Sequence, residues 1–198
     1  MSGKRDTGEY TSTKERITHT ALRLFSLKGF KGTTIKDIAR EVGITEGAIC
    51  RHFRSKEEIV EYLVKRVSGE LGDLLSAKVL SHSGIVAQVK ALAETLINYA
   101  FDNPDSFRFL TVYHLLKADS HKGKLPGGLL MENFRKAYLR GELAVLPEVA
   151  LSLAVGTVER LFILWEFGVV KAHRSRLIRE VQESLARALY RNGCGGGI

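Results

Sequence analysis

Apolar residues recur every three or four positions along most of this chain, and that spacing predicts helices. The clearest run is residues 33–56, TTIKDIAREVGITEGAICRHFRSK. In its first half, Ile35, Ile38, Ala39 and Val42 have the spacing that puts one apolar stripe on a helix. Gly43 follows at the point where the chain must turn, and glycine adopts positive φ without steric cost. The run therefore predicts two short helices joined at a glycine, which is a helix-turn-helix.

Both short helices have start signals. Thr34 can cap the first, with Asp37 three residues later as an imperfect capping box, and Thr45 can cap the second. Ile49 and Phe53 lie four residues apart, so both can point inward against the first helix. The opposite face carries small and polar residues, as a helix that enters a major groove requires. A surface helix of any helical protein would show the same pattern, so spacing alone leaves that alternative open.

Two further helices flank this unit. Ser12 and Glu15 form a capping box that begins a helix ending at Gly29, and its inner face is Ile17, Ala21, Leu24 and Phe25. Ser55 and Glu58 form another capping box that begins a long helix running to about Leu80. Lys56 lies in the first turn of this helix, where free backbone N–H groups and a lysine can bind a phosphate. Spacing alone favours an ordinary solvated surface lysine.

The rest of the chain also has helical spacing. Helices are expected at 85–101, 107–117, 129–139, 149–170 and 175–190, with a polar break at 81–84, a loop at 118–128 and a floppy tail at 193–198. Alternation with a period of two is nowhere long enough to predict a strand. The predicted fold class is therefore all-α, with a three-helix DNA-binding domain at residues 1–55 and a helical regulatory and dimerisation domain at 56–198. Residues 1–11 are expected to be a mobile arm, which either reaches into a minor groove or is simply disordered.

Segment 149–170 is apolar nearly all round and is about long enough to span a bilayer. Glu159 and Arg160 lie in its middle, and burying a charge in lipid costs several kcal/mol, so we reject a membrane span. A helix that is apolar on every side must be covered on every side. We therefore expect it to pair, together with the last helix, with their copies across a two-fold axis. The apolar stripe of the last helix is Leu177, Ile178, Val181, Leu185 and Leu189.

Charge adds to this picture. The formal net charge is +8, and residues 1–55 hold 11 Lys or Arg against 6 Asp or Glu, so most of the excess lies in the helix-turn-helix end. That balance suits a polyanionic partner, although many unrelated proteins are as basic. Cys50 and Cys194 are too few and too far apart for a disulfide framework or a zinc site, which favours a reducing, cytoplasmic location. We expect no metal and no cofactor.

Residues 13–60 resemble the DNA-binding domain of the TetR (tetracycline-repressor-like) family of bacterial transcriptional regulators. The run that carries the resemblance is ALRLFSLKGFKGTTIKDIAREVGITEGAICRHFRSKEEI, in which the pattern G-F-x-x-T-T-I-x-x-I-A-x-x-V-G-I-T-x-G-x-I-x-x-H-F-x-S-K-E is intact. The remaining residues resemble the family only in length, helical pattern and position. The resemblance implies a homodimeric repressor that binds an inverted-repeat operator and is released by a small, largely apolar effector. A DNA-binding regulator without such an effector is the alternative.

The resemblance also implies residue roles. Positions that face bases or backbone in the major groove match Thr45, Glu46, Gly47, Ala48 and Arg51. Positions that hold phosphates match Thr33, Thr34, His52 and Lys56. Cys50 departs from the pattern, because the family usually has a tyrosine there that packs or contacts the DNA backbone. A thiol is a weaker donor and reaches less far, so His52 is expected to carry more of that contact. A redox role for Cys50 stays open.

An effector pocket is harder to place. The polar-tipped or large aromatic residues and the one mid-helix arginine that could line it are Tyr99, Tyr113, His114, Phe134, Tyr138, Arg160 and Trp165. For each of them, ordinary core or interface packing is an alternative. An enzyme is not expected, because the sequence has no metal-spaced histidine pair, no nucleophile elbow and no phosphate-cradling glycine loop.

Overall fold

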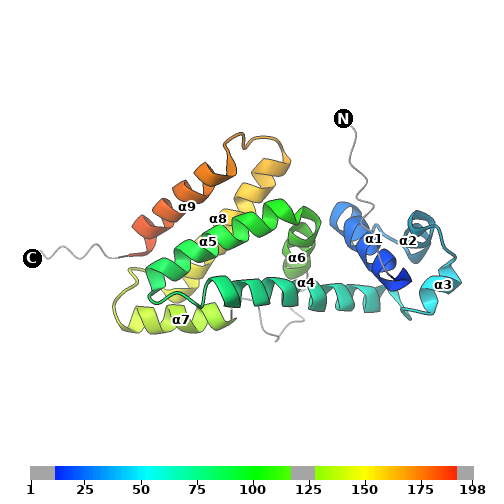
Figure 1. The fold of residues 1–198 in the computed structure, drawn as a ribbon, viewed down its shortest axis with the longest axis horizontal. Coiled ribbons are helices and arrows are strands. Elements are labelled where there is room, and N and C mark those ends of the chain that lie inside the picture. Colours follow the sequence, from blue (N-terminus) through cyan, green and yellow to red (C-terminus); the bar gives the residue numbers. More distant parts are fainter. Residues whose placement is uncertain (1–11, 117–127, 191–198) are drawn as a thin grey trace, which may run out of the picture. The chain divides into compact units, whose positions relative to one another are not determined.

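The computed structural model describes residues 12–116 and 128–190; the expected arm at 1–11, most of the 118–128 loop and the tail at 193–198 lie outside this part. The described helices are α1 Thr13–Lys28, α2 Ile35–Val42, α3 Glu46–Cys50, α4 Lys56–Lys78, α5 Ile85–Asp102, α6 Pro104–Leu116, α7 Gly128–Leu139, α8 Pro147–Glu166 and α9 Arg174–Leu189 (Figure 1). Isolated β-bridging occurs between Leu143 and Tyr190. The all-α prediction is confirmed.

The described helices fall into two compact units. Unit 1 comprises Met1–Val67 and Asp105–Leu116, and unit 2 comprises Ser68–Pro104 and Lys117–Ile198. Helix α4 therefore contributes residues to both units, whereas α6 groups with the helix-turn-helix although it follows α5 in sequence. The expected division between residues 55 and 56 falls inside unit 1, because the start of α4 and the part of α6 from Asp105 to Leu116 also belong to that unit.

Unit 1 is built around the predicted inner faces. The buried apolar residues of α1 are Ile17, Ala21, Leu24 and Phe25, and those of α2 are Ile38, Ala39 and Val42. Helix α1 begins with a complete capping box, in which the backbone N–H of Glu15 donates to Ser12 Oγ (3.2 Å) and the backbone N–H of Ser12 donates to Glu15 Oε2 (3.1 Å). It ends at Gly29, whose φ is 72°. The local signals in the sequence thus correctly predicted this helix.

Helix α6 is held onto the end of α1 by a polar cluster. Ser26, which is buried, has its Oγ 2.7 Å from Asp105 Oδ1. Arg108 Nη1 donates to that carboxylate (2.9 Å) and to the Ser26 hydroxyl (3.2 Å). The rings of Phe25 and Phe109 stack beside the cluster, with centroids 6.4 Å apart. This attachment joins two segments about 80 residues apart in sequence, so no local pattern could have predicted it.

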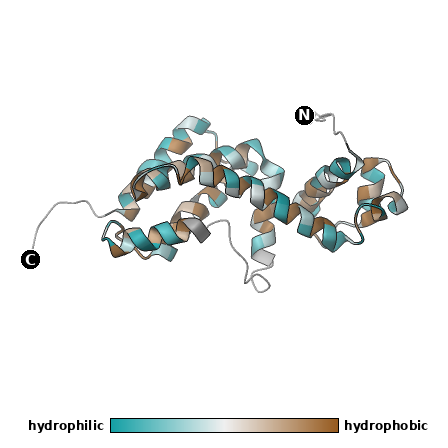
Figure 2. Ribbon diagram, turned by 60° about the horizontal axis from the view of Figure 1, so that its bottom comes forward, coloured by the Kyte–Doolittle hydropathy of each residue, from teal (hydrophilic) through white to brown (hydrophobic). Residues whose placement is uncertain are grey.

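In unit 2, α5 packs against both α8 and α9, and α7 packs against α8 (Figure 1). The buried residues of α9 are Leu177, Val181, Leu185 and Leu189, which confirms most of its predicted stripe, while Ile178 is half-buried. The buried face of α8 includes Ala150, Ala154, Val158 and Phe162, each four residues after the last. Figure 2 shows the resulting hydrophobic and hydrophilic stripes along the helices.

The exposed side of α8 carries apolar residues at the start of the helix and Arg160 further along it. Leu146, Val149 and Leu153 are 54%, 42% and 38% exposed. The helix ends at Glu166 rather than at the expected residue 170, because Gly168 adopts a φ of 69° and the N–H of Val169 returns to the carbonyl of Leu164 (2.9 Å). None of the helices in the described ranges is long and apolar enough to cross a membrane.

Two other helices begin or end at residues other than those expected. The long helix α4 ends at Lys78, two residues before Leu80, and α6 begins at Pro104 rather than at Phe107. Proline fits the first turn of a helix because its missing N–H would have no intrahelical partner there. Residues 104–106, which precede the expected start of this helix, are therefore helical.

Candidate nucleic-acid interface

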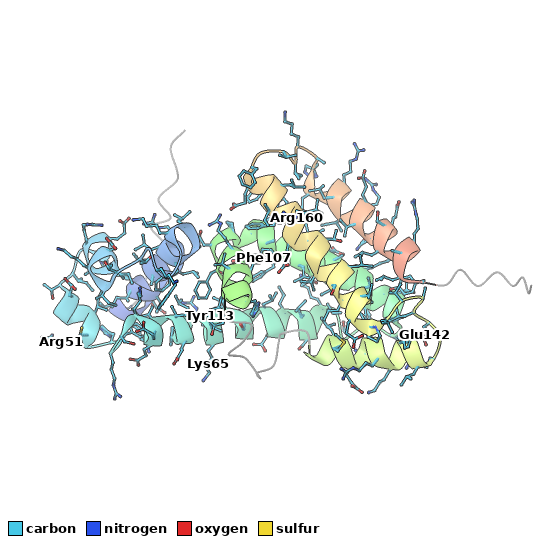
Figure 3. The ribbon with its side chains drawn as sticks, turned by 180° about the vertical axis from the view of Figure 1, so that it is seen from behind. Arg51, Lys65, Phe107, Tyr113, Glu142 and Arg160 are labelled. Carbon is cyan, nitrogen blue, oxygen red and sulfur yellow. The ribbon has the colours of Figure 1, made fainter. Side chains whose placement is uncertain are left out.

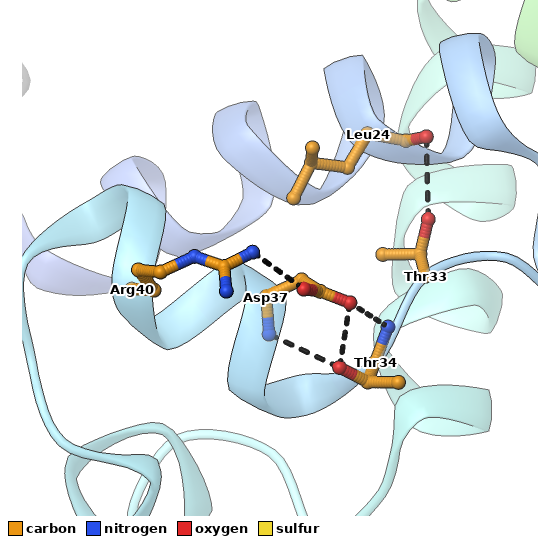
Figure 4. Close-up of polar contacts among 5 residues, drawn as sticks. All are labelled: Leu24, Thr33, Thr34, Asp37 and Arg40. Carbon is orange, nitrogen blue, oxygen red and sulfur yellow. Dashed lines mark hydrogen bonds and ion pairs between the residues drawn. The ribbon is translucent and has the colours of Figure 1, made fainter.

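The start of α2 is fixed by a closed polar network (Figure 4). The backbone N–H of Asp37 donates to Thr34 Oγ1 (3.1 Å), while Asp37 Oδ2 accepts from the Thr34 backbone N–H (3.0 Å) and hydroxyl (2.6 Å). Arg40 Nη2 donates to the other carboxylate oxygen at 2.7 Å. The capping box is therefore complete, although the sequence predicted an imperfect one, because an aspartate at this position reaches back as a glutamate would.

The turn after α2 is closed by backbone and side-chain donors. Gly43 is in the left-handed region (φ 77°, ψ 37°), and its N–H donates to the carbonyl of Ala39 (2.9 Å). Arg16 Nη2, from α1, donates to the carbonyl of Val42 at 2.6 Å. The carbonyls of Ala39 and Val42 in the last turn of α2 thus have partners, which set the direction in which the chain leaves the helix.

Helix α3 is short and is held by its inner face. Ile49 has no exposed surface and Phe53 is 3% exposed, whereas the backbone N–H of Ala48 donates to Thr45 Oγ1 (3.2 Å) at the start of the helix. The predicted outer face is solvent-accessible: Ala48 is half-buried, and exposed residues are Thr45, Glu46, Gly47, Cys50, Arg51 and His52. Arg51 projects from the end of α3 (Figure 3).

Gly47 has open space where a side chain would lie. A Cβ at this position would meet only Thr45 Oγ1, at 3.9 Å, and the φ of Gly47 is not positive. Neither packing nor backbone conformation therefore requires glycine here. The absence of a side chain leaves the backbone of α3 open to close approach by another molecule.

Thr33 does not belong to the accessible surface. It is completely buried, and its hydroxyl lies 3.0 Å from the carbonyl oxygen of Gly29 and 3.3 Å from that of Leu24. In this structure the hydroxyl closes the chain between α1 and α2, so the Thr33 side chain is not presented for the expected phosphate contact. Thr34 is exposed, but its hydroxyl is already bonded to Asp37.

Several supporting contacts have no counterpart in the sequence-based expectations. The ammonium of Lys14 lies 5.2 Å from the ring centroid of Phe53 and 4.5 Å from that of Tyr62. Arg23 of α1 pairs with Glu41 of α2. Lys56 Nζ donates to the carbonyls of Phe30 (2.8 Å) and Thr33 (2.9 Å). These partners are 18 to 48 residues apart, and no periodicity connects them.

The seven residues expected to line an effector pocket do not form one group. Tyr99 and Phe134 are buried in unit 2, and Trp165 packs there against Phe101 and Phe162 with centroids 4.7 and 5.9 Å away. Tyr113 and His114 lie on α6, in unit 1. Tyr138 and Arg160 are exposed, so they do not line the interior of unit 2.

Glu159, which was not among the expected pocket residues, is half-buried on α8. Burial raises the pKa of its carboxyl above the ordinary value, because the charged form loses hydration. The sequence offered one signal for it, a carboxylate in the middle of an otherwise apolar helix.

A capped helix, a tight left-handed turn and a short second helix with an open polar outer face define a helix-turn-helix protein. Residues 17–63 match the family model described as "Bacterial regulatory proteins, tetR family". The nucleoid occlusion factor SlmA of Haemophilus ducreyi is 33% identical over 97 residues, which are 49% of this chain and 48% of that protein. This chain therefore aligns with about half the length of that relative.

Other matches extend over most of the chain. The biofilm operon negative transcriptional regulator IcaR of Staphylococcus aureus is 26% identical over 184 residues, covering 87% of this chain and 96% of that protein. The crystal structure of a TetR family transcription regulator from Marinobacter aquaeolei superposes with a TM-score of 0.75, covering 89% of this chain and 95% of that one at 14% identity. Residues 17–63 therefore carry the DNA-binding region of the TetR family of transcriptional regulators, and the chain as a whole shares the fold of a solved structure of that family. This confirms the resemblance inferred from residues 13–60 and the expectation of a regulator rather than an enzyme.

The Asp37 network makes the stability of unit 1 depend on pH. Hydrogen bonds from the hydroxyl and backbone N–H of Thr34, with a smaller effect of Arg40, lower the pKa of Asp37 in the folded protein. Its contribution to stability is therefore present above the unfolded pKa of about 4 and is lost as the pH falls through the lower folded pKa. Asp37→Asn should melt at a lower temperature than the wild type near neutral pH, and the difference should shrink on acidification to about pH 3, as followed by circular dichroism.

Thr34→Ser is the matched control, because it keeps the hydroxyl and should leave the melting curve nearly unchanged at every pH. A difference between Asp37→Asn and the wild type that stays constant down to pH 3 would contradict the role given to the ionised carboxylate.

Proposed function

We propose that this chain is a homodimeric transcriptional repressor that binds an inverted-repeat operator through α3 and is released from DNA by a small, largely apolar effector. The main support is the geometry of α3. Buried Ile49 and Phe53 fix the helix, and an open face carries Thr45, Gly47 and Arg51 outward. Small residues and an exposed guanidinium together suit close approach to base edges in the major groove.

Within this proposal the exposed residues divide by chemistry. Arg51 can donate two parallel hydrogen bonds to guanine, and the exposed backbone at Gly47 lets it approach. Thr45 and Glu46 lie in the first turn and face the same groove. Thr34 and His52, which are exposed, are assigned to phosphate contacts. Cys50 is exposed, so its short thiol replaces the longer side chain that the family usually has there.

Arg51→Ala should weaken binding to the operator by about 1–3 kcal/mol if the guanidinium reads a base, with a much smaller loss on random duplex. The operator is first located by nuclease protection of the DNA beside the gene, and affinities are then measured by fluorescence anisotropy. Arg135→Ala, which removes the same charge from an exposed site on α7, is the control. Equal losses on operator and random DNA would show that Arg51 grips only phosphate.

We propose that a second copy of the chain packs against the outward face of α8. This face carries Leu146, Val149 and Leu153, and Gly156 continues it with no other group within 4 Å of the place where a Cβ would lie. The outward face of α9 is charged instead, with Arg176 bonded to Glu180 and Arg187 to Glu183. In the proposed four-helix interface, α8 therefore supplies the apolar centre and α9 the polar border. Such a dimer can hold two α3 helices about 34–36 Å apart, one groove repeat.

Leu153→Glu should convert the dimer to a monomer, because two glutamates would be buried in the apolar centre of the interface. Val86→Glu on α5 is the matched control: Val86 is 43% exposed and Leu153 38%, so each change places a charge at a similarly exposed site. Molar mass from sedimentation equilibrium distinguishes the outcomes. A Leu153→Glu protein that stays dimeric would move the interface elsewhere, and a monomeric wild type would overturn the homodimer.

An effector site is proposed among α5, α7 and α8, where Tyr99, Phe134 and Trp165 supply apolar surface. An effector releases the protein from DNA only if it prefers the DNA-incompetent conformation, and a coupling of about 1–3 kcal/mol gives roughly 5- to 150-fold release. Two elements support such coupling. Helix α4 has residues in both units, and the Ser26–Asp105–Arg108 cluster ties α6, which follows α5 almost directly, to α1.

Binding of an effector should raise the melting temperature, by an amount that corresponds to about 2.7 kcal/mol at a ligand concentration 100 times its dissociation constant. A panel of apolar and aromatic compounds is screened by thermal shift, and each hit is then tested for loss of operator affinity. A panel that never shifts the melting curve favours the alternative, a DNA-binding regulator without a small effector. A hit that stabilises the protein and leaves operator affinity unchanged would contradict release by that compound.

A further inference from the structure

Lys56 is enclosed by groups of its own protein. Its ammonium donates to the carbonyl oxygens of Phe30 (2.8 Å) and Thr33 (2.9 Å). The same nitrogen lies 4.1 Å from the centroid of the Phe30 ring, within cation–π range. The residue is half-buried, although it is the first residue of a helix. A solvated surface lysine has none of these contacts.

These contacts occupy most of the hydrogen-bond donors of the ammonium. An ammonium has three N–H bonds and no acceptor, and here two of them go to carbonyls while an aromatic face covers a further side. Only one N–H remains, so a phosphate would have to share the ammonium with two carbonyls and the ring of Phe30, or displace them. The present geometry therefore disfavours the phosphate role that the family resemblance implied.

The carbonyls that Lys56 holds lie in the short connection between α1 and α2. Thr33 in this connection is fixed a second time, because its buried hydroxyl bonds back to the carbonyls of Leu24, in α1, and of Gly29, just after it. The next residue, Thr34, caps α2. A side chain from α4 thus helps to fix where the connection lies and where the helix-turn-helix begins. The ring of Phe30 also packs against Phe25, with 5.9 Å between centroids. We call Lys56, the Phe30 ring and the two carbonyls bonded to Lys56 the clasp.

We propose that Lys56 is a positioning residue, which couples the first turn of α4 to the entry of the helix-turn-helix, and is not a phosphate ligand. The inference rests on the proposed DNA-binding function and assigns one residue within it. Loss of the clasp lets the Phe30–Thr33 connection move relative to α4, and α2 and α3 move with it. Binding to the specific operator, which requires one orientation of α3, is then reduced more than binding to arbitrary DNA, which tolerates many orientations.

The test compares Lys56→Met with Lys36→Met, which removes the same charge from an exposed site in the first turn of α2. Affinity for the operator and for a random duplex of equal length is measured over a series of salt concentrations. If Lys56 positions the helix-turn-helix, Lys56→Met should bind the operator about tenfold or more weakly than the wild type. Its affinity for random DNA should fall no more than that of Lys36→Met. The slope of its affinity against salt should equal that of the wild type.

A phosphate ligand would behave differently. Each lost phosphate contact lowers the slope of log K against log salt by about 0.9, and the loss is the same on every sequence. A flattened slope with equal losses on operator and random DNA would therefore overturn the proposal, as would an unchanged operator affinity. If the wild type itself shows no preference among duplexes, the proposed function fails, and that outcome is distinct from both.

Phe30→Leu provides a second variant that changes no charge. It removes the ring face of the clasp, so it should reproduce the operator-specific loss of Lys56→Met in weaker form, and the double variant should lose less than the sum of the two. Hydrogen exchange of the amides in residues 33–38 should be faster in both variants than in the wild type. Additive losses, or unchanged exchange together with the operator defect, would show that the two side chains do not act through one clasp.

Discussion

A helix of five residues cannot hold itself together in water, because fixing its backbone costs more than its few hydrogen bonds return. Helix α3 therefore exists only through the burial of Ile49 and Phe53 against the rest of unit 1. This dependence settles the character of its outer face. Since the inner residues supply the stability, the outer residues need not contribute to it, and they are available for contacts with another molecule.

The polar groups around α3 divide into two sets. Asp37, Thr33, Arg16 and Lys56 are bonded to backbone or to neighbouring side chains, and together they fix where α2 begins, where it ends and how α3 leaves it. Arg51 and His52 are exposed instead. Rigid support behind an open surface is the arrangement expected of a recognition element, because a preorganised surface loses little conformational entropy on binding.

The sequence predicted the helix-turn-helix almost completely, since its signals are local: the spacing of Ile35 and Ile38, the caps at Thr34 and Thr45, and the turn at Gly43. Contacts between distant segments could not be predicted in this way. The attachment of α6 through Ser26 and Asp105 and the clasp made by Lys56 have no periodic signature. The proposed effector site has the least support in the sequence, because a buried aromatic residue such as Phe134 looks the same in a pocket and in a core. The end of α8 was misplaced because apolar residues continue beyond Gly168, where the backbone leaves the helix.

Gly47 bears on how readily proteins of this type acquire new targets. Alanine would favour a helix over glycine by roughly 0.5–1 kcal/mol, and the space around this position would admit a methyl group. Folding therefore places little restriction on residue 47, although it lies on the surface proposed to meet base edges. Mutation there is free to alter sequence preference while leaving the scaffold intact, so divergence of operators between related regulators need not pass through unstable intermediates.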